Sequence, residues 1–111
     1  MSAVDVVQRQ VDAYNAQDLD AFCACFADDC VIADLNGAVT QQGAAALRAR
    51  YQQMFAQYPE NTARIVNRIV VGDVVIDHED IRRSADLSIS AVAIYTVKNG
   101  LIARCDFVRE T

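Results

Sequence analysis

Several sequence signatures are missing from this chain of 111 residues, and each absence excludes a class of function. No apolar run approaches the roughly 18 residues that cross a bilayer, so we expect no membrane-spanning segment. Basic residues are scattered singly, apart from the pair Arg82-Arg83, and do not form the basic stripe that nucleic acid requires. Glycine-rich phosphate loops, nicotinamide-binding fingerprints and Ser–His–Asp signatures are also missing. We therefore expect no cofactor, no nucleic-acid partner and no membrane partner.

The four cysteines and the one histidine do not form a metal-binding pattern. Cys23, Cys25 and Cys30 are close together in the sequence and Cys105 is distant, without a C-x-x-C motif. His78 lies apart from both groups, so we expect no zinc site. We interpret the cysteines as small buried apolar residues in a reducing compartment, with redox or metal roles as the alternative.

The composition indicates a soluble globular chain that forms one domain over residues 1–111. Apolar residues make up 53% of the chain and charged residues 23%, with a net charge of −5. These values are typical of folded rather than disordered proteins, and the length allows one core. The segment Met1–Asp5 lacks the basic region and apolar core of a signal peptide, so we expect a cytoplasmic protein.

The first half of the chain predicts three helices and a small hairpin. Apolar residues recur at helical spacing before Asn15 and again between Gly43 and Pro59. Asp18 is placed to cap a second helix, and Asn36-Gly37 predicts a tight turn after a short apolar strand. The expected elements are helices over 3–16, 18–27 and 44–57 and strands over 29–35 and 38–40.

The second half of the chain predicts long strands. Stretches rich in β-branched residues flank Gly72-Asp73 and, further along, Lys98-Asn99-Gly100. A run of helices followed by a meander of strands predicts an α+β fold, with the helices packed on one face of a curved sheet. The expected strands cover 64–71, 74–81, 87–97 and 101–108.

This order of elements resembles the NTF2-like superfamily, in particular its SnoaL-like and ketosteroid-isomerase-like branch, over nearly the whole chain. The matching segments include Asn15–Asp20, Phe26–Asp29 leading to Asp34, and Asn99–Ile102. The resemblance implies a cone, in which three N-terminal helices pack on a strongly curved, mostly antiparallel sheet and enclose one apolar cavity. It also implies a small-molecule ligand in the cavity and a homodimer formed through the outer face of the sheet.

The resemblance transfers only part of a catalytic site. Ketosteroid isomerases use a carboxylate base and an oxyanion hole made of a tyrosine and a protonated aspartic acid. Asp34 falls at the base position, but Gln10 and Ala93 occupy the positions of the two donors, and Tyr51 matches a supporting tyrosine. Because the loss of one such donor costs several kcal/mol of transition-state stabilisation, we do not expect an ordinary ketosteroid isomerase.

Alternation along the segment 74–81 offers a second ionisable pair. If Val74 and Ile76 face the cavity, His78 and Asp80 do so too, and the imidazole becomes a proton partner or substrate anchor whose tautomer Asp80 or Asp34 fixes. We predict this orientation. The alternatives are that the opposite positions face inward or that this end of the strand is exposed. In our prediction the Asp77/Glu79 pair lies on a solvated or dimer-facing surface.

We predict an enzyme that performs acid–base chemistry on a small, partly apolar molecule, with Asp34, His78 and Asp80 as its catalytic residues. Isomerisation by proton transfer is the first expectation, and hydration or hydrolysis the second. The alternatives are that Asp34 is a solvated residue at a strand end, and that the protein is a non-catalytic ligand-binding or dimerisation module. The expected cavity residues are Gln10, Tyr14, Tyr51, Phe55, Ala93, Tyr95, Cys105 and Phe107, with Gln10 or Tyr95 as the donor to developing charge on oxygen.

Overall fold

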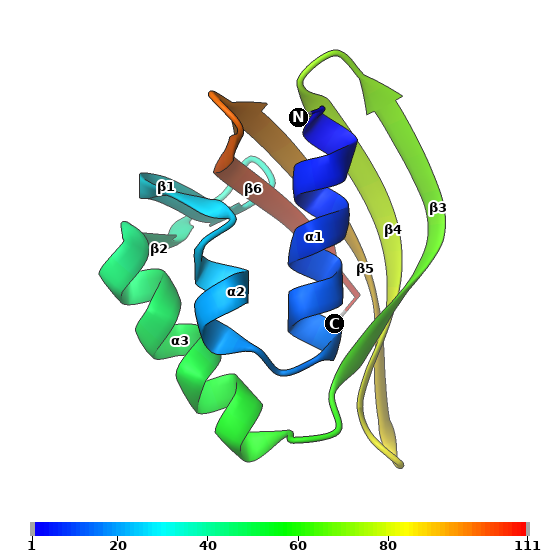
Figure 1. Ribbon diagram of the computed structural model, residues 1–111. Helices are drawn as coiled ribbons and strands as arrows, with labels where there is room; N and C mark the ends of the chain where they lie inside the picture. Colours follow the sequence, from blue (N-terminus) through cyan, green and yellow to red (C-terminus); the bar gives the residue numbers. More distant parts are fainter. Residues whose placement is uncertain (1, 111) are drawn as a thin grey trace.

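The computed structural model describes residues 2–110, which form a six-stranded sheet with three helices on one side of it (Figure 1). The helices are α1 (Ala3–Asn15), α2 (Leu19–Cys23) and α3 (Ala44–Gln57), and the strands are β1 (Phe26–Asp34), β2 (Val39–Gln42), β3 (Thr62–Val71), β4 (Val74–Ser84), β5 (Leu87–Lys98) and β6 (Leu101–Arg109). The strand order is β2-β1-β6-β5-β4-β3, and only the β1–β6 pair is parallel. The predicted α+β class with a mostly antiparallel sheet is confirmed.

Helix α1 begins at a capping box and lies against the concave side of the sheet (Figure 1). The Ser2 hydroxyl accepts a hydrogen bond from the Asp5 N–H, and the Asp5 carboxylate accepts one from the Ser2 N–H. Two donors that the first helical turn leaves without partners are thereby satisfied. The predicted apolar stripe of α1 is buried and contacts β3, β4 and β5. No helix within residues 2–110 is long and apolar enough to cross a bilayer.

The second predicted helix is too long. Asp18 does cap α2 through the Ala21 N–H, but the helix ends at Cys23 and β1 already begins at Phe26. The Cys25 carbonyl accepts a hydrogen bond from Ile102 of β6, and Phe26 pairs with the same residue. This pairing to a strand far along the chain outweighs the local helical pattern, since tertiary contacts routinely override propensity.

Five aromatic rings from α1, α2, β1 and α3 fill much of the space between the helices and the sheet. Neighbouring ring centroids lie 4.5 to 6.3 Å apart, mostly with edge-to-face or tilted geometry. Such pairs add to the stabilisation from burial itself. The rings belong to Tyr14, Phe22, Phe26, Tyr51 and Phe55. They leave little space for the apolar cavity that the resemblance implies.

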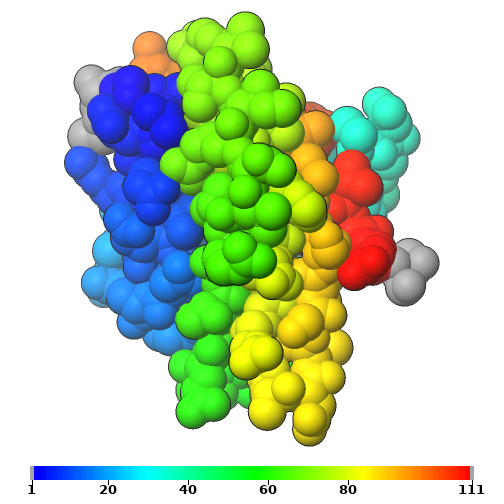
Figure 2. Space-filling model, turned by 90° about the vertical axis from the view of Figure 1, so that its right-hand side faces the viewer, coloured from blue at the N-terminus to red at the C-terminus, as the bar shows by residue number. Residues whose placement is uncertain are grey.

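Strand β3 forms an edge of the sheet and runs along the middle of one side of the molecule (Figure 2). In that view α1 lies on one side of β3 and the β4–β5 hairpin on the other. Several large apolar side chains of β3 are exposed to solvent. They are Val66, Ile69, Val70 and Val71.

Candidate functional site

A small cavity lies between α1, α3 and the concave side of the sheet. Its volume is about 30 Å³, which is room for roughly two water molecules, whereas sites for drug-sized ligands measure about 300–1,000 Å³. An organic ligand therefore requires side chains to move. The flexible side chains of Met54, Arg83 and Arg109 form part of the wall and are suited to such movement. The other polar residues of the wall include Gln10, Glu79 and Tyr95.

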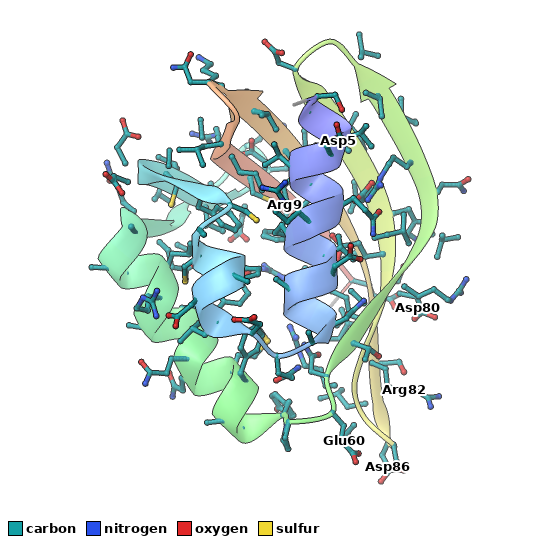
Figure 3. The ribbon with its side chains drawn as sticks, viewed as in Figure 1. Asp5, Arg9, Glu60, Asp80, Arg82 and Asp86 are labelled. Atoms are coloured by element: carbon teal, nitrogen blue, oxygen red, sulfur yellow. The ribbon has the colours of Figure 1, made fainter. Side chains whose placement is uncertain are left out.

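The orientation of β4 decides which ionisable groups face this cavity. The prediction that His78 and Asp80 face inward is wrong, because the opposite alternation of the strand is buried. In Figure 3 Asp80 points away from the helices, on the outer side of the sheet. The buried positions of β4 are Val75, Asp77, Glu79 and Ile81.

The two outward residues have partners on the outer face. The His78 Nε2 atom lies 3.0 Å from the Ser90 hydroxyl, and an Asp80 oxygen lies 3.3 Å from an Arg64 nitrogen in an exposed ion pair. The two inward carboxyl groups have partners as well, because Arg68 pairs with Asp77 and the Tyr95 hydroxyl donates to Glu79. Catalytic roles for His78 and Asp80 consequently lose the geometry on which that prediction depended.

Glu79 is the ionisable carboxyl group on the cavity wall. It is 5% exposed, and its Oε1 atom accepts a hydrogen bond of 3.3 Å from the Tyr95 hydroxyl. Burial, reinforced by the nearby charge of Asp77, raises the pKa of Glu79 to about 7, although Tyr95, Arg68 and Arg109 oppose the rise. A carboxyl group with this pKa exchanges its proton easily at neutral pH, as a general acid or base must.

Asp77 lies two residues earlier on the same face and has a different environment. It is fully buried, and Arg68 donates to both of its oxygens at 2.6 and 2.9 Å. The same guanidinium donates to the Gln8 side chain of α1 at 2.7 Å. Through Arg68, therefore, β3 and β4 are joined to α1, and we assign Asp77 a structural role as the carboxylate that holds this guanidinium.

Gln10 brings an unpaired amide to the cavity. It is 5% exposed on α1, and its Oε1 atom is buried without a hydrogen-bond partner among residues 2–110. Buried polar atoms nearly always have a partner, and one without a partner is costly. A ligand or water in the cavity that donates a hydrogen bond would satisfy this oxygen, and the NH₂ group of the same amide can donate to a ligand oxygen.

Two tyrosines of the wall, Tyr51 and Tyr95, act as neutral hydroxyl groups. Burial raises the pKa of Tyr51 and that of Tyr95 well above the ordinary value, so both phenols keep their protons. The structure places five of the eight expected cavity residues on the wall: Gln10, Tyr14, Tyr51, Tyr95 and Phe107. The other three, Phe55, Ala93 and Cys105, are buried but do not line the cavity. Burial also raises the pKa of the Cys105 thiol, which disfavours a nucleophilic thiolate.

Asp34 lies outside the cavity wall. Its side chain is about half exposed at the end of β1, where an oxygen lies 3.4 Å from Arg109 Nη1. Arg109 stacks on the Phe107 ring and lines both the cavity and the open depression that contains Asp34. Asp34 is thus connected to the cavity through this guanidinium, and its role as a base stays a prediction.

Comparison with known proteins agrees with the fold. A family model described as a SnoaL-like domain matches residues 7–105. The chain belongs to the SnoaL-like family. The matched region includes Gln10, Glu79 and Tyr95, which come from three different elements of this SnoaL-like fold.

Solved structures extend this comparison. A cystatin-fold protein from Novosphingobium aromaticivorans is 29% identical, with a TM-score of 0.92 over 98% of this chain and 99% of that chain. A proposed polyketide cyclase from Sinorhizobium meliloti is 27% identical, with a TM-score of 0.80 over 94% of each chain. A proposed ketosteroid isomerase from Kribbella flavida is 16% identical, with a TM-score of 0.83 over 98% of this chain and 78% of that chain, which shows the fold alone.

Sequence reasoning missed Glu79 as a site residue in this SnoaL-like protein. A usable signal was the pairing of β4 with β5, whose residues Ala93 and Tyr95 were already expected to line the cavity. In the observed register Tyr95 pairs with Val75 and Ala91 pairs with Glu79, and paired residues lie on the same side of a sheet. The register of one hairpin would therefore have fixed the orientation of β4.

Proposed function

We propose that this SnoaL-like protein is a cofactor-independent acid–base enzyme that moves a proton on a small, partly apolar carbonyl compound. The observation that carries the proposal is the environment of Glu79, a carboxyl group buried at a cavity wall with a hydroxyl partner. No arginine or lysine of the described part of the chain bonds to it directly. Its pKa of about 7 suits proton transfer at neutral pH. The unpaired Gln10 amide in the same wall supports a ligand with a polar atom.

The proposed step begins with the Glu79 carboxylate. It takes a proton from a carbon next to the carbonyl, so the C–H electron pair moves into an enolate and Glu79 becomes a neutral acid. The Gln10 amide donates to the enolate oxygen and stabilises its charge. Where the substrate carries a carbon–carbon double bond next to the reacting carbon, the enolate extends over that bond. Glu79 then returns the proton to the far carbon of the extended system, the double bond shifts toward the carbonyl, and an isomerisation is complete. Met54 and the two arginines of the wall must move to admit the substrate.

The relatives support an enolate-forming reaction. The protein from Sinorhizobium meliloti is described as a proposed polyketide cyclase, and an aldol cyclisation begins with the same removal of a proton beside a carbonyl. Here Glu79 takes the role that the sequence comparison gave to Asp34. That competing prediction, with Asp34 as the base, is tested in the same experiment.

The experiment follows exchange of α-hydrogens for deuterium by ¹H NMR in D₂O, with butanone, cyclohexanone and 5-oxohexanoate as probes. The natural protein should accelerate the exchange of at least one probe over buffer. Glu79→Gln, which keeps the shape but not the basicity, should lower the rate by about 10²–10⁴-fold.

Asp34→Asn is the matched control, because it removes a carboxylate that lies outside the cavity wall. It should retain the rate of the natural protein. A folded Glu79→Gln protein with full exchange activity would overturn the proposal, and loss of activity in Asp34→Asn alone would assign the base to Asp34.

A non-catalytic ligand-binding module is the second candidate, favoured by Gln10 and Ala93 at the positions of the two oxyanion donors. It predicts that a probe binds with a measurable Kd while the natural protein leaves the exchange rate at that of buffer. The same samples therefore decide between the two functions.

We also propose a homodimer formed through the outer face of the sheet. The exposed apolar side chains of β3, among them Ile69 and Val71, support it, since such patches favour association. Sedimentation equilibrium should give twice the chain mass for the natural protein and a shift toward the monomer for Ile69→Lys. A monomer at all accessible concentrations would contradict the dimer.

A further inference from the structure

Arg83 lines the cavity at its α3 end and forms no ion pair with a carboxylate of residues 2–110. Its Nη1 atom donates to the Tyr14 hydroxyl at 2.9 Å and to the Asn61 side-chain oxygen at 3.1 Å, and both acceptors are neutral. It is half-buried, and its planar group also lies over the Tyr58 ring. Within residues 2–110 the ion pairs of arginine involve Arg48, Arg64, Arg68, Arg104 and Arg109. Neither Arg83 nor Arg50 is among them.

These two arginines line a second hollow, which adjoins the cavity. It has a volume of about 270 Å³ and is partly open to solvent. Arg50, Gln53 and Gln57 come from one face of α3, where residues three and four apart are neighbours. Met54 and Arg83 line both the hollow and the inner cavity, so these two side chains separate them.

The electrostatics of this hollow oppose those of the whole chain. The protein has 15 acidic and 10 basic residues, yet the hollow is lined by two guanidinium groups, two amides and a phenol, without a carboxylate. The carbonyl end of α3 contributes a partial charge of roughly −0.5 nearby. Two full positive charges exceed it. Glu60, which follows α3, does not line the hollow and points away from the helices (Figure 3).

We propose that this hollow binds an anionic group of the substrate, a carboxylate or a phosphate, while the carbonyl part of the same molecule passes Met54 into the inner cavity. Guanidinium groups bind both oxyanions through paired, charge-assisted hydrogen bonds, and Gln53, Gln57 and Tyr58 supply neutral donors beside them. The substrate class is then a small oxo acid or carbonyl phosphate. This inference rests on the proposed function, because it places the reacting carbon beside Glu79.

The test measures binding and exchange separately. In ¹⁵N NMR, acetate and inorganic phosphate should each shift the side-chain Nε–H signals of Arg50 and Arg83 in the natural protein. Calorimetry compares each anion with its uncharged analogue: 5-oxohexanoate with its methyl ester, and dihydroxyacetone phosphate with dihydroxyacetone. In at least one of these two pairs the anion should bind about tenfold more tightly. The pair with the larger ratio of affinities shows whether the hollow prefers a carboxylate or a phosphate.

Arg50→Gln should remove most of that preference, and Arg83→Gln should remove it entirely. Arg48→Gln is the matched control, because Arg48 is on the same helix but pairs with Asp20 at 2.8 Å and lies outside the hollow. It should leave the preference unchanged. If Arg83→Gln does not fold, Arg50→Gln still decides, since Arg50 makes no side-chain hydrogen bond or ion pair within the described chain.

Equal binding of acid and ester, together with equal binding of phosphate and alcohol, would overturn the subsite, as would an unchanged preference in Arg50→Gln. The arginine signals do not depend on Glu79. Their response to anions is therefore expected even if the proposed reaction is wrong. Loss of exchange in Glu79→Gln is likewise expected even if the anion subsite is wrong.

Discussion

Asp77 and Glu79 are two buried carboxyl groups on the same face of β4, and the comparison between them explains the site. Arg68 lies opposite Asp77 in the β3–β4 register, whereas Ile65 lies opposite Glu79. Asp77 is accordingly held by a cation, and Glu79 by a single hydroxyl beside a cavity. The two carboxyl groups are two residues apart on one strand, but different residues of β3 lie opposite them. For this reason Asp77 stabilises the fold, whereas Glu79 is suited to proton transfer.

The largest expected effect is on the Asp77 side of this comparison. Arg68→Met leaves the Asp77 carboxylate buried without its cation, so the free energy of unfolding should fall by about 3–5 kcal/mol. Urea denaturation measures this loss. The double variant Arg68→Met, Asp77→Leu should recover most of it, and a single variant as stable as the natural protein would show that the pair is not structural.

The next effect is the pH dependence that Glu79 gives to stability. The unfolded chain releases this proton near the ordinary pKa of 4.5, whereas the native state holds it to about 7. Between those values the native state binds more protons, so the free energy of unfolding falls as the pH rises through this window. The whole shift corresponds to roughly 3 kcal/mol.

Glu79→Gln should remove this slope. Urea denaturation at several pH values between 4.5 and 7.5 measures the free energy of unfolding of both proteins. As the pH rises, the natural protein should lose stability relative to the variant. A constant difference over the range would contradict the raised pKa.

A smaller effect is expected for Tyr95→Phe, which removes the hydroxyl that donates to Glu79. Because that hydrogen bond favours the charged carboxylate and lowers its pKa, the pKa of Glu79 should rise further in the variant. The free energy of unfolding should fall by about 1 kcal/mol at neutral pH. An NMR titration that places the variant pKa below that of the natural protein would rule out this hydrogen bond.

The smallest effect concerns Asp34, a carboxyl group that is neither buried nor firmly paired. Its contact with Arg109 at 3.4 Å joins two substantially exposed side chains, and exposed ion pairs contribute about 0–1 kcal/mol. Asp34→Asn should therefore change the free energy of unfolding by less than about 1 kcal/mol in urea denaturation. A larger loss would show that Asp34 has a structural role that its exposure does not reveal.

The sequence predicted the order and class of the elements because local signals mark them. Asp18 caps α2, Asn99-Gly100 turns between β5 and β6, and Pro59 follows α3. The start of β1 was missed because its first residue pairs with Ile102, a contact across most of the chain.

The site was predicted only in part. Gln10 and Tyr95 could be placed inward because apolar neighbours mark their faces. In β4, apolar and ionisable residues occur on both faces of the strand, so alternation alone does not distinguish His78 from Glu79. The deciding factor is which carboxylates find donors across strands, and that requires the register with β3 and β5.

The most direct measurement is the titration of the Glu79 side-chain carboxyl group by ¹³C NMR, with Glu79→Gln used to assign its signal. We expect a midpoint near pH 7, because the group is buried and no cation of residues 2–110 bonds to it directly. A midpoint near the ordinary value of 4.5 would mean that Glu79 is well solvated or firmly paired, and the proposed proton transfer would lose its base.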